Sequence, residues 1–154
     1  MAQQSYLTDE VKARIGKTVE TRTLEIDRSI IRTYAHAVGH TDPIFFDEEY
    51  AKRQGYRSLV APPGIPGSLI FQHEPTTSLP YAVPGPSRLL NGGTEMEYYD
   101  TICAGDVLVA VTKIVDITER AGSLGPMLLV RRETTYTNQE GKVVAKAWGM
   151  LIQY

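Results

Sequence analysis

Two residues with proton-exchanging side chains lie close together in the loop Gly39–Phe46. His40 carries an imidazole, a common proton shuttle near neutral pH, and the carboxylate of Asp42 follows two residues later. General acid/base chemistry needs groups of these kinds, so we predict His40 and Asp42 as the catalytic residues. An alternative stays open, in which both belong to an ordinary polar turn, since Asp before Pro43 is a common turn residue.

Metal and cofactor chemistry are not expected. His36 and His40 are four residues apart, but Gly39 should end the helix between them, and no third ligand lies nearby. Cys103 is the single cysteine, which argues against a disulfide framework or a thiolate cluster. Gly92-Gly93 lacks the spacing of a dinucleotide-binding or phosphate-binding loop, and a bulge or a close backbone approach is expected there instead.

Four helices are expected to position these residues. The main helix begins at the N-cap Asp27 and stops at Gly39, because apolar residues recur between them at helical spacing. A later helix follows Ala61-Pro62-Pro63, which forces an extended entry. This later helix is Gly64–His73. The two other predicted helices are a short one from Thr8 through about Ile15 and Glu48–Gln54 after the N-cap Asp47.

Much of the remaining chain has the β-branched, alternating pattern of strands. Turn-forming segments such as Ala104-Gly105-Asp106 separate the later strands, as in antiparallel hairpins. A long helix against such a sheet is an α+β arrangement, which is the fold class we predict. The predicted strands are Lys17–Ile26, Thr94–Thr101, Val107–Ile117, Met127–Thr137 and Lys142–Tyr154.

Length and composition favour a single globular domain, residues 1–154. Hydrophobic residues make up 42% and charged residues 22%, which argues against disorder. The formal net charge is -2 and the basic residues are scattered, so a nucleic-acid surface is not expected. An apolar run of about 20 residues and a leader pattern are both missing, so we expect no membrane span and a cytoplasmic location.

A longer pattern surrounds the loop. It resembles the MaoC-like hydratase/dehydratase family, especially its N-terminal-type units and the non-catalytic subunit of mycobacterial hydroxyacyl-thioester dehydratase. The resemblance covers the chain from about Lys17 to Tyr154. The segments that carry it are Tyr34–Asp47, Gly55–Arg57, Val60–Pro63, Asn91–Glu95 and Cys103–Asp106.

The resemblance implies a single hot-dog fold, in which an antiparallel sheet wraps around a central helix, and dimers that join two sheets. It also implies a reaction, the reversible addition of water to a trans-2-enoyl thioester, which gives an (R)-3-hydroxyacyl product. In catalytic members an Asp and a His hold the water, and a glycine N–H at the start of the central helix stabilises the thioester oxyanion.

This chain departs from the catalytic pattern Gly-Asp-x-Asn-Pro-x-His. His40 stands at the Asp position, Asp42 at the Asn position and Phe45 at the His position. Pro63 matches the residue that donates the N–H, and a proline has none. A standard oxyanion hole therefore requires Gly64 to take over that role.

Two hypotheses follow from these departures. In the first, the chain shapes the acyl channel of a heterodimer whose catalytic hot-dog partner supplies Asp and His. In the second, His40 and Asp42 form a rearranged pair in a homodimer. Either way the expected substrate is an acyl thioester of coenzyme A or of an acyl carrier protein. The expected substrate-binding residues are Tyr34, Phe45, Arg57, Pro63, Gly64, Ile65, Gly92 and Gly93.

Two rival functions remain. Hot-dog folds also hydrolyse acyl thioesters, and a thioesterase would need a carboxylate such as Asp42, Asp47 or Glu74. Alternatively, the chain is a catalytically silent scaffold subunit, a hypothesis that Phe45 and Pro63 favour.

Overall fold

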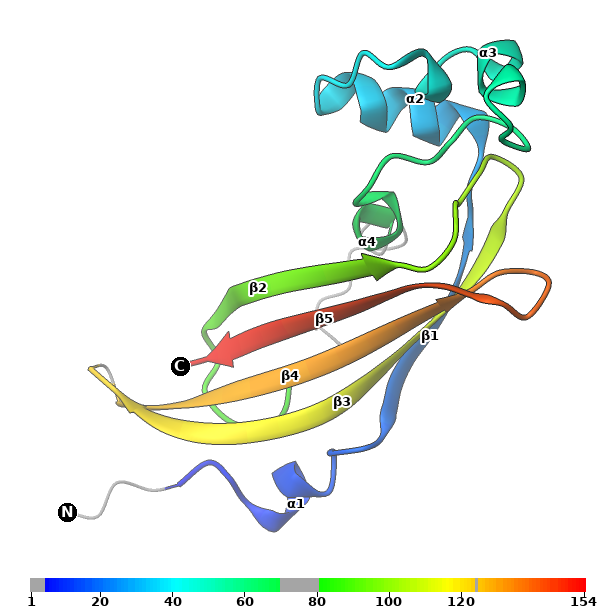
Figure 1. Ribbon diagram of the computed structural model, residues 1–154. Helices are drawn as coiled ribbons and strands as arrows, with labels where there is room; N and C mark the ends of the chain where they lie inside the picture. The colour runs from blue at the N-terminus through cyan, green and yellow to red at the C-terminus, as the bar shows by residue number, and fades with distance from the viewer. Residues whose placement is uncertain (1–4, 70–80, 124) are drawn as a thin grey trace.

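The fold is dominated by one antiparallel sheet. The computed structural model describes residues 5–69, 81–123 and 125–154, and within them five strands are ordered β1-β3-β4-β5-β2. Figure 1 shows the strands as long, twisted arrows that run side by side, with β2 at one edge. The strands are β1 (Thr18–Glu25), β2 (Leu89–Tyr98), β3 (Val107–Gly122), β4 (Gly125–Thr137) and β5 (Val143–Gln153).

Two helices begin at the N-caps that the sequence predicts, whereas the first helix ends at Lys12 rather than at about Ile15. The side chain of Asp27 accepts the N–H of Ile30 at 2.8 Å and starts α2, and Asp47 starts α3 by accepting the N–H of Tyr50 at 3.0 Å. Gly39 follows α2 with a positive φ of 76°, a conformation that glycine adopts without strain. The helical elements are α1 (Asp9–Lys12), α2 (Arg28–Ala37), the 3-10 turn η1 (Pro43–Phe45), α3 (Glu48–Arg53) and α4 (Ile65–Leu69).

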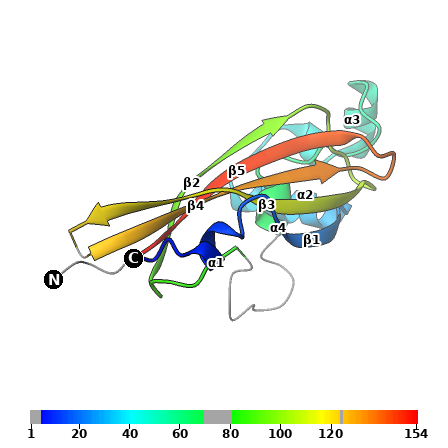
Figure 2. The ribbon, with the colours of Figure 1, turned by 90° about the horizontal axis from the view of Figure 1, so that it is seen from below.

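Helices α2, α3 and α4 gather toward one end of the sheet, while α1 lies apart from them (Figures 1 and 2). Helix α4 is the described part of the predicted helix Gly64–His73; the remainder, including His73, lies outside the described residues. The predicted arrangement of an antiparallel sheet against a helix is confirmed.

Side chains alternate across the sheet and give it two unlike faces. On β5, Ala145, Ala147 and Leu151 are buried, whereas the intervening Trp148 and Met150 are partly exposed. We call the face with the buried residues the inner face and the opposite one the outer face.

The inner face carries two apolar clusters. The first, near the helices, joins Ile31 of α2 and Ile65 of α4 to strand residues such as Leu108. The second lies toward α1 and joins Val11 to strand residues such as Val130. Between them the inner face is polar, since Thr112 and Thr134 are buried and their hydroxyls lie 2.9 Å apart in a hydrogen bond.

The start of β2 and the end of β3 differ most from the predicted strand boundaries. β2 begins at Leu89 rather than Thr94, because a register shift between Asn91 and Gly93 carries the strand through the glycines; the predicted bulge is confirmed. β3 continues to Gly122 rather than ending at Ile117, because a second bulge changes the alternation between Ile114 and Asp116 without ending the pairing with β4.

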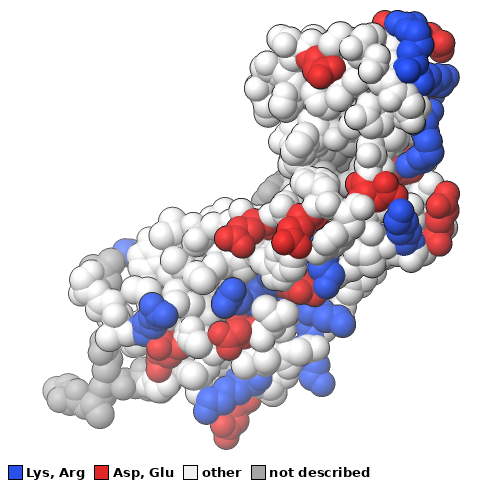
Figure 3. Space-filling view, in the orientation of Figure 1, with Lys and Arg blue, Asp and Glu red and all other residues white. Residues whose placement is uncertain are grey.

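The surface mixes charges of both signs. On the face in Figure 3, Asp and Glu are interspersed with Lys and Arg over the sheet, in keeping with the scattered charges of the sequence. Within the described residues, no helix combines the length and the apolar character needed to cross a membrane.

Candidate functional site

The loop after α2 uses its polar residues to organise its own backbone. The carboxylate of Asp42 accepts the N–H of Ile44 at 3.0 Å and caps η1. The backbone N–H of His40 donates to the carbonyl of Ala35 at 2.9 Å, at the end of α2. The side chain of His40 is exposed, and the centroid of its ring lies 5.0 Å from that of Phe45. Within the part of the chain that the structure describes, His40 and Asp42 share no hydrogen bond or ion pair.

Phe45 occupies the position of the catalytic histidine in the family pattern. Its side chain is only 7% exposed and belongs to the same apolar cluster as Ile65, which is fully buried. An open groove outside this cluster is lined by Phe45 and Pro63. The loop therefore presents an apolar ring at the position where a catalytic member presents an imidazole.

A cavity of about 580 Å³ lies between α4 and the polar zone of the inner face. We call it the inner cavity. Pro63 and Gly64 line it from the segment that leads into α4, and Tyr98 lines it from β2. Its volume falls within the range of small-molecule sites, about 300–1,000 Å³. Pro63 and Tyr98 also line the open groove, so the two spaces adjoin.

Two tyrosine hydroxyls hold the segment between the cavity and the groove. The N–H of Gly64 donates to the hydroxyl of Tyr98 at 2.7 Å, and the hydroxyl of Tyr34 donates to the carbonyl of Pro63 at 3.3 Å. Burial raises the pKa of Tyr98, so its hydroxyl stays protonated, and it donates to the sulfur of Met96 at 3.3 Å. The N–H of Gly64, the donor that an oxyanion hole would need here, is already engaged.

Gly64 is required by its surroundings. Its φ is +94°, and a Cβ at this position would overlap the hydroxyl of Tyr34. The structure therefore brings together four of the predicted site residues, Tyr34, Pro63, Gly64 and Ile65, with Phe45 beside them, while His40 and Asp42 line neither the cavity nor the groove.

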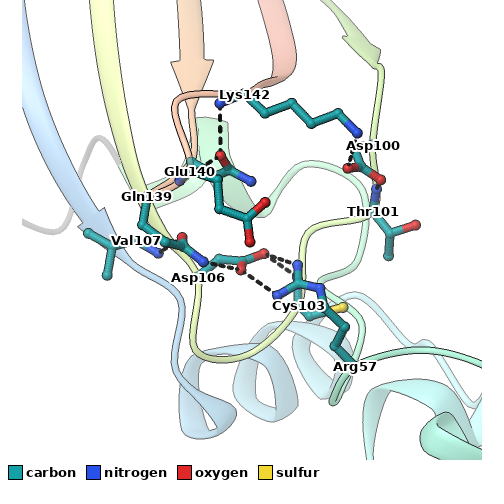
Figure 4. A network of polar contacts seen from close by, with 10 residues as sticks. Arg57, Asp100, Thr101, Cys103, Asp106, Val107, Gln139, Glu140 and Lys142 are labelled. Carbon is teal, nitrogen blue, oxygen red and sulfur yellow. Dashed lines mark hydrogen bonds and ion pairs between the residues drawn. The ribbon is translucent and has the colours of Figure 1, made fainter.

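Arg57 lies in a separate polar network (Figure 4). Its two terminal nitrogens donate to the two carboxylate oxygens of Asp106 at 2.9 Å each, and the N–H of Cys103 donates to the same carboxylate. Burial pushes the pKa of Asp106 upward, but the hydrogen bonds from Arg57, Cys103 and Gln139 outweigh it and hold the pKa below its ordinary value. A role of Arg57 in substrate binding stays a prediction.

Gly92 and Gly93 lie on the edge strand, away from Pro63 and Gly64. They line a smaller cavity of about 340 Å³ with Trp148 and Met150, whose side chains belong to the outer face. A Cβ at Gly92 would meet the side chains of Met150 and Ile152 at 3.1–3.2 Å. Close packing explains the absence of a side chain at Gly92, and substrate contact by the pair stays a prediction.

Sequence reasoning missed several polar residues of the inner cavity. Arg132, Thr134 and Tyr136 alternate along β4 and line the cavity together with Tyr98. The strand pattern carried a signal for them. Leu128 and Val130 are buried and are spaced by two residues along β4, and the same spacing places Arg132 on their core-facing side. Burial also raises the pKa of Tyr136, so its hydroxyl stays neutral.

Other chemistries find less support in these residues. Asp42 and Asp47, two of the carboxylates that a thioesterase would recruit, cap η1 and α3, and Glu74 lies outside the described residues. Within residues 5–69, 81–123 and 125–154, no three side chains of the metal-binding kinds come together.

Comparisons with known proteins converge on one group. The profile of the FAS1-like dehydratase domain region matches residues 13–147. A UPF0336 protein of Streptomyces coelicolor is 31% identical, and the alignment covers 86% of each chain. Among solved structures, a chain of the HadBC (3R-hydroxyacyl-ACP dehydratase) complex from Mycobacterium tuberculosis is 26% identical with a TM-score of 0.67, covering 85% of this chain and 90% of that one. An R-hydratase from Pseudomonas aeruginosa is 21% identical with a TM-score of 0.70, covering 90% and 81%.

Proposed function

Because the chain belongs to the family of FAS1-like dehydratase regions and has the MaoC-like hot-dog fold, we propose that it is the substrate-channel subunit of an (R)-specific hydratase/dehydratase. The assembly interconverts 2-enoyl and 3-hydroxyacyl thioesters of coenzyme A or an acyl carrier protein. This chain holds the acyl group, and a hot-dog partner supplies the Asp and the His that exchange protons.

One observation carries the proposal. The inner cavity is present, whereas the loop that bears the acid/base pair in catalytic members contributes no proton-exchanging side chain to it. Asp42 is used as a cap, the ring of His40 is exposed, and Phe45 is part of the core. Catalysis requires a base within hydrogen-bond reach of the proton that it moves, so the acid and base must come from elsewhere.

The geometry also suggests where the thioester lies. Tyr98 and Pro63 separate the inner cavity from the open groove, so a thioester at this point would extend its acyl group into the cavity and its carrier along the groove. The hydroxyl of Tyr98 accepts the N–H of Gly64 and donates its own proton to the sulfur of Met96, a weak acceptor that a thioester carbonyl oxygen would replace.

The edge strand β2 supports a partner on that side. Each of its ten residues is exposed or partly exposed, and Leu89 and Leu90 are 44% and 53% exposed. An uncovered edge offers backbone hydrogen bonds and apolar area to another strand. HadBC, a dehydratase complex of similar fold, supports a heterodimer over a homodimer.

The test is hydration of crotonyl-CoA by the chain alone and by the chain co-expressed with each hot-dog protein encoded beside it. We expect no turnover alone and (R)-3-hydroxybutyryl-CoA from one of the pairs. In the active pair, His40→Gln and Asp42→Asn should retain activity, and Asn keeps the cap of η1. Hydration by the chain alone that His40→Gln abolishes would favour the rearranged pair instead. Release of free coenzyme A would indicate a thioesterase.

A further inference from the structure

Arg132 is a cation on the inner face, and none of the acidic side chains that the structure describes forms an ion pair with it. Within the described residues its one specific contact is with Tyr81, whose ring centroid lies 4.2 Å from the central carbon of the guanidinium. Arg57, by comparison, donates two hydrogen bonds to a buried carboxylate. A guanidinium is never deprotonated in proteins, so Arg132 brings a permanent positive charge to the inner cavity that it lines.

The surroundings of Arg132 leave its hydrogen-bond donors available. The central carbon of the guanidinium lies over the ring of Tyr81, and this cation–π contact uses none of the N–H groups in a hydrogen bond to an oxygen. On the neighbouring strand Arg132 is opposite Gly149, where an added Cβ would lie 2.7–2.9 Å from guanidinium atoms. The glycine thus leaves the space in which the guanidinium lies.

The other charges at the cavity do not neutralise Arg132. Glu20 also lines the cavity, but its carboxylate accepts the Nε–H of Arg22 at 2.5 Å. Between these groups and Arg132 lie the hydroxyls of Thr112 and Thr134, which are bonded to each other. Among the residues that the structure describes, none compensates the positive charge of Arg132 at this end of the cavity, and such a charge favours an anionic ligand group.

The position of Arg132 relative to Tyr98 indicates which part of a ligand it would meet. Tyr98 pairs with Ala145 on β5, and Ala145 pairs with Tyr136 on β4. Arg132 is four residues from Tyr136 on the same strand, a Cα separation of about 13 Å. A thioester carbonyl beside Tyr98 would therefore direct its acyl chain along β4 toward Arg132.

We propose that the inner cavity binds acyl groups that end in a carboxylate, and that Arg132 anchors this terminal carboxylate. The inference rests on the proposed function for the position of the thioester. A bidentate contact with the guanidinium would replace the water lost by the carboxylate on entering the cavity. A methyl end at the same point would leave Arg132 desolvated and unpaired, which is unfavourable.

Calorimetric binding of suberyl-CoA and octanoyl-CoA to the full chain and to its active pair tests the inference. The two thioesters have equal carbon number and differ at the chain end. We expect suberyl-CoA to bind about tenfold or more tightly, and Arg132→Met to remove this preference, because only suberyl-CoA can form a hydrogen-bonded ion pair with the guanidinium. Arg132→Lys keeps the charge and should retain part of the preference. Arg131→Met is the matched control, since its side chain lies on the outer face and should leave the preference unchanged.

The outcomes separate the two proposals. Equal binding of the two thioesters, or a preference that survives Arg132→Met, would overturn the role of Arg132 while leaving the channel function intact. If neither thioester binds and no pair hydrates crotonyl-CoA, the proposed function fails and the inference falls with it.

Discussion

Asp106 and Arg57, 49 residues apart in sequence, form a bidentate ion pair with both N–O distances at 2.9 Å. The carboxylate is 1% exposed, whereas the arginine side chain is 57% exposed. Two further donors, the N–H of Cys103 and the amide of Gln139, complete the coordination of the carboxylate. The pair ties the segment after α3 to the turn before β3, and so holds the helical end of the molecule on the sheet.

Replacing Asp106 should therefore lower the free energy of unfolding. Asp106→Ala removes the shared acceptor and leaves the buried N–H of Cys103 without a partner, and we expect a loss of about 3 kcal/mol in the free energy of unfolding. Asp100→Ala is the control, because its ion pair with Lys142 is exposed and should contribute less than about 1 kcal/mol. Urea unfolding at neutral pH measures both, and equal losses would contradict the structural role of Asp106.

The same carboxylate should make stability depend on pH. Its folded-state pKa is below the ordinary value of about 3.9, so its contribution is complete above that value and is lost as the pH falls through the folded-state pKa. An asparagine side chain does not titrate in this range, so the stability of Asp106→Asn lacks this dependence on pH. The difference in unfolding free energy between wild type and Asp106→Asn should therefore shrink as the pH falls below about 4. A difference that stays constant down to pH 2 would show that the charge has no such role.

Gly64 offers a test of the tyrosine clamp, by which we mean the hydrogen bonds of Tyr34 and Tyr98 to Pro63 and Gly64. Gly64→Ala should cost about 2 kcal/mol or more, because strain at a φ of +94° adds to the overlap with the hydroxyl of Tyr34. Tyr34→Phe removes that hydroxyl, so the double variant should be more stable than the sum of the single losses predicts. Thermal or urea unfolding of the four proteins gives this coupling.

A matched glycine separates strain from overlap. Gly55 has a similar φ of +92°, and nothing lies within 4 Å of an added Cβ. Gly55→Ala should cost only the strain, about 1 kcal/mol, and Tyr34→Phe should not change that cost. Coupling between Tyr34→Phe and Gly55→Ala would mean that the clamp is not local to Gly64.

Local sequence signals predict much of the fold, but they do not predict which distant residues contact the site residues. The caps Asp27 and Asp47 and the stop at Gly39 act within a few residues, so the sequence alone locates the helix ends. The bond between Gly64 and Tyr98 spans 34 residues and depends on strand register, which bulges shift. The sequence accordingly predicts Arg57 only as a substrate-binding residue and carries no sign of its ion pair with Asp106.

Restoring the histidine of the family pattern should not restore catalysis in this chain. Phe45 is 7% exposed within an apolar cluster, so Phe45→His would lose buried apolar area and place a polar ring there. We expect a loss of about 2–3 kcal/mol in unfolding free energy and no hydration of crotonyl-CoA by the variant alone. Phe45→Leu, which keeps the site apolar, should cost about half as much. Turnover by Phe45→His alone would show that one substitution separates this loop from a catalytic one, and would contradict its assignment to a channel subunit.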